Sequence, residues 1–385
     1  MSVQVSYKKQ FIFFIMLFFI LLVITEVAIR YVETFEPSCM FTNSEIFSNY
    51  NNLEKDQMCF EYKSVELDYS QPFAIAKPNQ IGDYVNINSD GYRGKEISDE
   101  SKYRIIFLGG STVFGTVTTS DETTIPAFVE KKLNEKKFNV HVINAGIPSA
   151  TSIDEIYLLE NDLLKYDPDL VIMYDGWNDI TERNKIKFNI QYEEFKNNSY
   201  VENVAEFSNK ENTIQNISIK KIFNFLVDID YRTGVGLAML IRDNFISNAD
   251  INEIKNSENI SDLKLIEERL GNNWGKVCNL GKENSFKTVN FIQPGIETSS
   301  RNLSNEEIIL ISQTTQITEM NYLKKMDVEK LGNNSCENII DLRNTFDNIN
   351  NKTIFFDPIH VSDYGNEIIS EKIVSIIIPI IKEDF

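Results

Sequence analysis

Histidine and cysteine are scarce in this sequence. Its 385 residues include two histidines and four cysteines, and no two cysteines form a Cys-x-x-Cys motif. A structural zinc site needs about four such ligands at close spacing. The composition therefore argues against a Cys/His zinc site, and nothing in the sequence predicts another metal or an organic cofactor.

Basic residues are also in the minority. The chain has 38 Lys+Arg against 57 Asp+Glu, which gives a formal net charge of -19. Proteins that bind nucleic acid or anionic lipid headgroups do so mainly through a positively charged face. We therefore expect no nucleic-acid partner, and the acidic balance by itself indicates only solubility.

The cysteines allow two interpretations. They lie at Cys39, Cys59, Cys278 and Cys336. In an oxidising compartment they would form two disulfides, Cys39–Cys59 and Cys278–Cys336. In a reducing compartment all four would be buried free thiols, and the sequence alone leaves both interpretations open.

A long apolar run lies at the amino terminus. Residues 11–24 are continuously apolar, residues 27–29 extend the run, and Lys8 and Lys9 precede it. No small-x-small cleavage site follows, so a single-span anchor over residues 1–32 is favoured over a cleaved signal peptide or a buried core helix. The lysines predict a cytoplasmic amino terminus and an extracytoplasmic body.

Beyond Arg104, short apolar runs alternate with helical patterns. This alternation predicts βαβ units and a parallel sheet within a three-layer α/β/α sandwich. The helices are expected from Pro126, over residues 152–166 and from Asp363, where apolar residues recur at helical spacing. The five expected strands are Ile105–Leu108, Val140–Asn144, Leu170–Tyr174, Thr288–Pro294 and Thr353–Phe356.

These patterns predict three regions. Residues 1–32 form the anchor, and residues 33–101 form an irregular juxtamembrane connector that wraps the body. Residues 102–385 form an α/β domain. A polar, Asn-rich stretch at about 181–262 interrupts it as an inserted cap or lid, or as a plain surface insertion.

Residues suited to nucleophilic catalysis follow the predicted strands. A glycine pair ends the first strand, and Ser111 comes next. Open α/β sheets bind ligands at the carboxyl ends of their strands. A serine hydroxyl needs a base, and of the two histidines His141 lies inside a strand pattern, which leaves His360. Asp357, three residues earlier, is placed to orient the imidazole.

The same strand ends could stabilise an oxyanion. The backbone N–H groups of Ser111 and Gly146 and the side-chain amide of Asn178 would supply three donors. Taken singly, each of these residues is also common in ordinary turns that have no catalytic role. Their occurrence in this order, each at the end of a predicted strand, favours a shared catalytic site.

Four short blocks in this sequence resemble those of the SGNH hydrolases, also called the GDSL esterase/lipase superfamily. They are Gly109-Gly-Ser111, Asn144-Ala-Gly146, Gly176-Trp-Asn-Asp179 and Asp357-Pro-Ile-His360. The resemblance covers Arg104 to the carboxyl terminus apart from the insertion. It implies a flavodoxin-like sheet, metal-independent ester hydrolysis or acyl transfer, and an acyl-serine intermediate. It also implies a triad of Ser111, Asp357 and His360.

Two positions depart from the family pattern. Gly110 stands where the name-giving motif has aspartate, and Ser149 stands where a glycine is common. The first variant is similar to that of membrane-anchored bacterial members. Both departures leave the expected nucleophile and the donor Gly146 in place. They nevertheless make it unsafe to assign the substrates of the better-known lipases to this chain.

The expected function is therefore that of a membrane-anchored extracytoplasmic serine esterase. Its substrates would be small molecules or envelope or exopolysaccharide glycans that carry O-acetyl or other short acyl groups. One alternative is an O-acyltransferase that uses the same triad. Another is a non-catalytic glycan-binding or assembly protein that retains the fold.

Overall fold

The computed structural model describes six stretches of the chain: residues 6–33, 39–68, 75–97, 102–181, 260–331 and 335–385. The chain divides into two units, one with the amino-terminal helix and one with the α/β body, and each is described by itself. The predicted insertion at 181–262 lies almost wholly outside the described residues. The three predicted region boundaries remain predictions.

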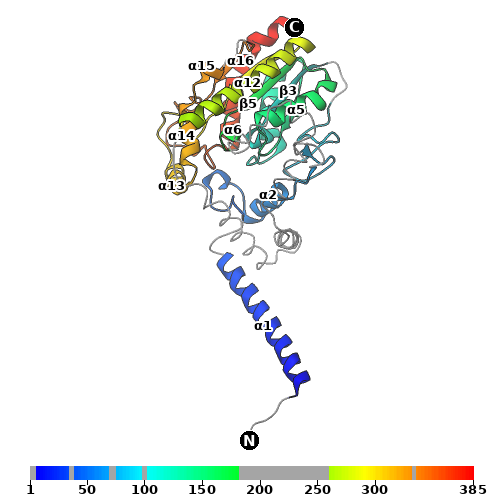
Figure 1. Ribbon diagram of the computed structural model, residues 1–385, viewed down its shortest axis with the longest axis vertical. Helices are drawn as coiled ribbons and strands as arrows, with labels where there is room; N and C mark the ends of the chain where they lie inside the picture. Colours follow the sequence, from blue (N-terminus) through cyan, green and yellow to red (C-terminus); the bar gives the residue numbers. More distant parts are fainter. Residues whose placement is uncertain (1–5, 34–38, 69–74, 98–101, 182–259, 332–334) are drawn as a thin grey trace. The chain divides into compact units, whose positions relative to one another are not determined.

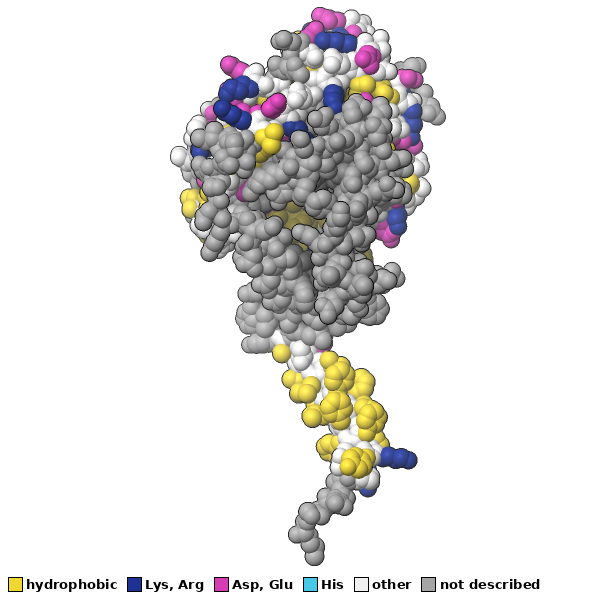
Figure 2. Space-filling model, viewed as in Figure 1, with side chains coloured by type: hydrophobic (Ala, Val, Ile, Leu, Met, Phe, Trp, Pro, Cys, Tyr) yellow, Lys and Arg dark blue, Asp and Glu magenta, His cyan; other side chains and the backbone are white. Residues whose placement is uncertain are grey.

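The amino-terminal helix α1 spans Tyr7–Glu33. Within it, Tyr7–Ala28 is a 22-residue stretch with a mean hydropathy of 2.8 and no burial of its side chains. Hydrophobic side chains cover the visible face of this helix (Figure 2). By length and composition it could cross a bilayer as an anchor or act as a signal sequence.

The body contains the predicted parallel sheet. Its strand order is β4-β3-β5-β6-β7, and all four strand pairs are parallel. Every residue of β4 and β5 is buried, as expected for a parallel sheet that is covered on both faces. The strands are β3 Tyr103–Gly109, β4 Val140–Gly146, β5 Leu170–Asp175, β6 Lys287–Ile292 and β7 Ile339–Asp341.

Helices flank this sheet, and the three-layer fold class is confirmed (Figure 1). Helix α4 packs on α16, and α5 packs on α12. Short helices α3 and α6 directly follow β3 and β5. The helices of the body are α3 Ser111–Phe114, α4 Ile125–Glu135, α5 Ser152–Asn161, α6 Trp177–Thr181, α12 Ile260–Asn284, α13 Asn305–Gln313, α14 Ile317–Lys325, α15 Val328–Leu331 and α16 Asp363–Ile381.

The segment ahead of the sheet is more regular than predicted. It contains α2 (Asn52–Ser64) and a small antiparallel pair, β1 (Leu67–Asp68) and β2 (Ile75–Ala76). Asn51 and Glu54 form a capping box: each side chain accepts a hydrogen bond from the other residue's backbone N–H. The Asn-x-x-Glu spacing is the sequence signal that would have identified this helix.

The fifth strand was predicted in the wrong place. The fifth strand of the sheet is β7, an edge strand that pairs with β6, whereas Thr353–Phe356 forms no strand of the sheet. The backbone N–H groups of Ile354 and Phe355 donate instead to Glu307 Oε1, at 3.0 Å each. A buried carboxylate thus takes the donors that a sheet ladder would have used.

Glu307 is fully buried, and removing its charge should destabilise the body. Burial acts to raise the pKa of Glu307, but the Arg301 guanidinium and the backbone donors outweigh it and lower that pKa. Glu307→Gln would leave the Arg301 charge buried without its partner, at a cost of about 3–5 kcal/mol. Chemical denaturation measures the loss. The exposed control Glu283→Gln should stay within about 0.5 kcal/mol of the unaltered protein, and an equally stable E307Q would contradict the expectation.

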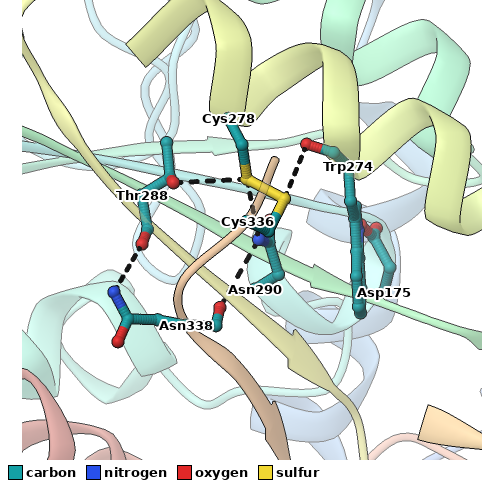
Figure 3. Close-up of a disulfide and its surroundings, with 7 residues drawn as sticks. All are labelled: Asp175, Trp274, Cys278, Thr288, Asn290, Cys336 and Asn338. Atoms are coloured by element: carbon teal, nitrogen blue, oxygen red, sulfur yellow. Dashed lines mark hydrogen bonds between the residues drawn. A yellow bond between two sulfur atoms is a disulfide. The ribbon is translucent and has the colours of Figure 1, made fainter. Parts of the chain in front are cut away.

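All four cysteines are oxidised, and the predicted bond between Cys278 and Cys336 is present. Cys278 of α12 is bonded to Cys336, in the segment that leads to β7 (Figure 3). Cys39 and Cys59 are disulfide-bonded as well. The free-thiol interpretation is therefore wrong for all four cysteines.

Candidate active site

Three predicted residues form a hydrogen-bonded chain at the carboxyl end of the sheet. Ser111 begins α3, immediately after the Gly109-Gly110 turn that ends β3. Its Oγ lies 2.7 Å from His360 Nε2. His360 Nδ1 lies 2.6 Å from Asp357 Oδ2. These are the contacts that a serine, its base and the carboxylate that orients the base require.

Asp357 is fixed by its own turn. Its Oδ1 accepts hydrogen bonds from the backbone N–H groups of Ile359 (2.9 Å) and His360 (2.8 Å). Burial would raise the pKa of Asp357, but the facing His360 and these hydrogen bonds prevail and lower it. The carboxylate therefore stays ionised and can accept the Nδ1 proton of His360, which leaves Nε2 free to face the serine.

Close backbone packing explains two of the glycines. A Cβ at Gly110 would lie 2.1 Å from Asn178 Nδ2, and a Cβ at Gly146 would lie 2.2 Å from Phe114 N. Neither site can hold a side chain without a shift of its neighbours. The absence of these side chains lets the Asn178 amide and the end of β4 approach the turn that carries Ser111.

The predicted oxyanion donors lie at the carboxyl ends of three neighbouring strands, β3, β4 and β5. Gly109 of β3 is in register with Gly146 of β4 and Tyr174 of β5, so the three strand ends are level. The Gly146 N–H donates to Asn144 Oδ1 at 3.1 Å, and Asn178 Nδ2 donates to the Ala150 carbonyl at 2.7 Å. A side-chain amide has two N–H donors, so Asn178 keeps one for a ligand.

His141 lies apart from this site. It sits near the start of β4, five positions before Gly146, which is about 16 Å along a strand. Its side chain is buried, and its Nδ1 lies 3.4 Å from Glu130 Oε2. His141 lies within a strand, as predicted, and is not placed to act on Ser111.

Sequence reasoning missed Arg93, which lies ahead of the sheet in sequence and supports helix α3. Its Nη1 donates to the carbonyls of Phe114 (3.0 Å) and Gly115 (2.6 Å), at the end of α3. Its Nε donates to Asp121 Oδ1 at 2.7 Å. Arg93 stands between turn residues of a polar stretch, so no periodic pattern marks it as buried.

The described part of the chain offers no obvious metal site. Among these residues, no three or more His, Cys, Asp or Glu side chains are grouped so that they could hold a metal ion.

Comparisons with known proteins give only distant structural likeness. No family model matches the sequence, and no curated protein matches it. Solved structures similar to it include an acetyl xylan esterase (16% identity, 71% of this chain and 99% of that one, TM-score 0.39). A second is a variant of an acetylxylan esterase from Geobacillus stearothermophilus (14% identity, 71% of this chain and 93% of that one, TM-score 0.36). A third is a lipolytic protein assigned to the G-D-S-L family from Desulfitobacterium hafniense (11% identity, 71% of this chain and 99% of that one, TM-score 0.37).

Likeness at this level establishes neither activity nor substrate. Over 71% of its length, the chain is similar in structure to esterases and to a protein assigned to the G-D-S-L family.

Proposed function

We propose that this chain is a serine esterase that cleaves short acyl esters through an acyl-serine intermediate. The observation that carries the proposal is the continuous hydrogen-bonded chain from Ser111 Oγ through His360 to Asp357, with contacts of 2.7 and 2.6 Å. An ordinary turn has no need for a serine, an imidazole and an ionised carboxylate in this order.

Each residue has a defined task in this reaction. Ser111 Oγ attacks the ester carbonyl while His360 Nε2 takes its proton, and Asp357 stabilises the imidazolium that forms. His360 then returns the proton to the departing alcohol, which leaves the acyl group on Ser111. Water, deprotonated by the same imidazole, attacks the acyl-serine and releases the acid and the free serine.

The developing oxyanion would be held by the Ser111 and Gly146 N–H groups and by Asn178 Nδ2. The Gly146 N–H, which donates to Asn144 in the free protein, would be shared with the oxyanion. The loss of one such donor typically lowers the rate by about 10²- to 10³-fold.

The proposed substrates are O-acetyl or other short acyl esters on envelope or exopolysaccharide glycans. The support is location: the apolar helix α1, with Lys8 and Lys9 in its first turn, would hold the body on the outer side of a membrane. Glycans are the abundant ester-bearing polymers on that side. Oxidation of the four cysteines suits the same compartment.

The proposal is tested by acylation of the purified full-length chain in a non-ionic detergent. With p-nitrophenyl acetate we expect turnover and a single acetyl group on the peptide that contains Ser111, detected by mass spectrometry after acid quenching. Ser111→Ala should lose both signals. Ser375→Ala, an exposed serine of α16, should keep both.

Two other outcomes would change the interpretation. Equal turnover in Ser111→Ala, with no adduct on Ser111, would refute the triad and favour a non-catalytic glycan-binding or assembly protein. Acylation of Ser111 followed by transfer to an added sugar, faster than release to water, would identify an O-acyltransferase.

A further inference from the structure

Four acidic side chains are buried together next to the proposed site. Their exposed fractions are 9% for Asp154, 1% for Glu155, 4% for Asp175 and 4% for Asp179. The first two lie at the start of α5, and the others flank the Gly176-Trp177-Asn178 turn, at the end of β5 and in α6. Arg269 of α12 supplies a positive charge that acts on Asp179.

Three of these carboxyl groups accept hydrogen bonds from neutral donors. A buried carboxylate that accepts such bonds can remain ionised. Asp154 accepts from Thr151 N (2.8 Å) and Thr151 Oγ1 (2.7 Å). Asp179 accepts from Ser152 N (3.3 Å) and Ser152 Oγ (2.6 Å). Asp175 accepts from Trp274 Nε1 (2.7 Å).

Glu155 differs from the other three. Neither of its oxygens meets a hydrogen-bond donor among the residues that the structure describes, yet its carboxyl group lies within hydrogen-bonding reach of Asp175. Two ionised carboxylates have no proton to share, so this contact requires one of them to be protonated.

The proton belongs on Glu155 at neutral pH. Burial and the neighbouring charge of Asp175 raise the pKa of Glu155 well above its ordinary value. Burial and Asp179 raise the pKa of Asp175, but Asp175 already accepts from Trp274, and the hydrogen bonds from Trp274 and Glu155 both favour its ionised form. Glu155 is therefore the donor and Asp175 the acceptor. Figure 3 shows Asp175 beside the Trp274 indole of α12.

This contact connects α5 to the turn that carries Asn178. Asp175 is the residue before Gly176, whose φ of 129° begins the turn. Asn178 Nδ2 is held by the carbonyl of Ala150, in the loop that leads into α5. The position of α5 relative to the end of β5 therefore determines where the Asn178 amide points.

We propose that Glu155 is a positioning residue for the oxyanion donor Asn178, because its protonated carboxyl donates to Asp175 and thereby ties α5 to the Asn178 turn. This inference rests on the proposed function for Asn178. The charged groups that act on Glu155 are Asp154 on its own helix, Asp175 from β5 and Asp179 from α6. From α12, Trp274 donates to Asp175 and Arg269 acts on Asp179.

A dependence on pH follows. When pH rises through the raised pKa of Glu155, the shared proton leaves, and the cluster gains a negative charge that its donors cannot balance. The contact between α5 and β5 then becomes repulsive. The folded state binds this proton more tightly than the unfolded state does, so the free energy of unfolding also falls as pH rises.

The test compares the full-length protein with Glu155→Gln and Glu155→Ala across the pH range. Glutamine keeps a donor for Asp175 but cannot ionise. E155Q should match the unaltered protein in kcat/KM for p-nitrophenyl acetate at pH 7 and should lack its alkaline decline. E155A should lose roughly 10- to 100-fold in kcat with little change in KM, because a displaced oxyanion donor costs somewhat less than a missing one. Glu268→Gln, exposed on α12, serves as the matched control.

A second measurement is independent of activity. Difference infrared spectra should show the C=O band of a protonated buried carboxyl group in the unaltered protein, absent from E155Q. If E155Q loses as much activity as E155A, or keeps the alkaline decline, the inference is wrong. A missing carboxyl band would overturn it even if E155A fails to fold. Absence of esterase activity in every variant, with the band present, would refute the proposed function but leave the proton-sharing pair established.

Discussion

Replacing Ser111 by alanine, His360 by alanine, or both together is expected to lower kcat/KM for a short-chain ester by the same factor. That factor should be on the order of 10⁴ or more, because groups that act as one unit show strongly non-additive effects. His360 Nε2 lies 2.7 Å from Ser111 Oγ, and each proton that it moves in the proposed reaction belongs to the formation or breakdown of the acyl group on Ser111. Once the serine is gone, the imidazole has no proton to take.

Steady-state kinetics on the two single variants and the double variant measure this non-additivity. Asp357→Asn should also lose about 10⁴-fold, since an amide holds the imidazole in the wrong tautomer. His141→Gln is the matched control, because that histidine lies outside the site. Additive losses in the double variant would show that Ser111 and His360 do not act together, and the proposed mechanism would fail.

The residues of the candidate triad were predictable because each is tied to a strand end by a short local motif. Ser111 follows a glycine pair, and Asp357 and His360 share one turn, so their relative placement needs only the sheet topology. Short apolar runs that end in turn residues were enough to identify four of the five strands.

The fifth strand and the supports of the site were not predictable in the same way. Ile339–Asp341 is only three residues long, which is too short to show a period. Thr353–Phe356 has the composition of a strand, but a buried carboxylate from α13 takes its donors. That competition depends on a contact between residues about 50 positions apart, which no local pattern records.

Buried polar residues were the other omission. Arg93 and Glu155 are 3% and 1% exposed, although charged side chains are usually at the surface. Each is explained only by partners from distant elements: Arg93 by the end of α3, and Glu155 by the end of β5. Buried charged residues of this kind can be identified only once the fold is known. In the proposed chemistry, Arg93 supports the end of α3 and Glu155 supports the turn that carries Asn178.

Removal of the Cys278–Cys336 disulfide is expected to produce a large loss of stability. The bond closes a loop with a sequence separation of 58 residues. In the chain-entropy model, a cross-link over a loop of this length contributes about 4 kcal/mol. The double variant Cys278→Ser/Cys336→Ser should therefore melt about 10 °C below the unaltered protein, as measured by thermal denaturation monitored by circular dichroism.

Serine is the appropriate replacement because the disulfide has polar neighbours. Thr288 Oγ1 and Asn290 Nδ2 lie 3.3 and 3.4 Å from Cys278 Sγ (Figure 3), and a serine hydroxyl can hydrogen-bond to either of them. The loss then reports the missing cross-link rather than unpaired polar groups. Because Cys39 and Cys59 are disulfide-bonded as well, a reductant should lower the melting temperature of both proteins, and of the double variant by less than that of the unaltered protein.

The effect on activity separates two roles for this bond. Cys278 lies one helical turn after Trp274 on α12, and Trp274 holds Asp175 at the start of the Asn178 turn. If the disulfide only stabilises the fold, kcat/KM measured well below the melting transition should be little changed, which is the expected result. A fall in kcat in the fully folded variant would instead show that the bond keeps α12 in the position that orients Asp175. Unchanged melting in C278S/C336S would contradict the entropic argument itself.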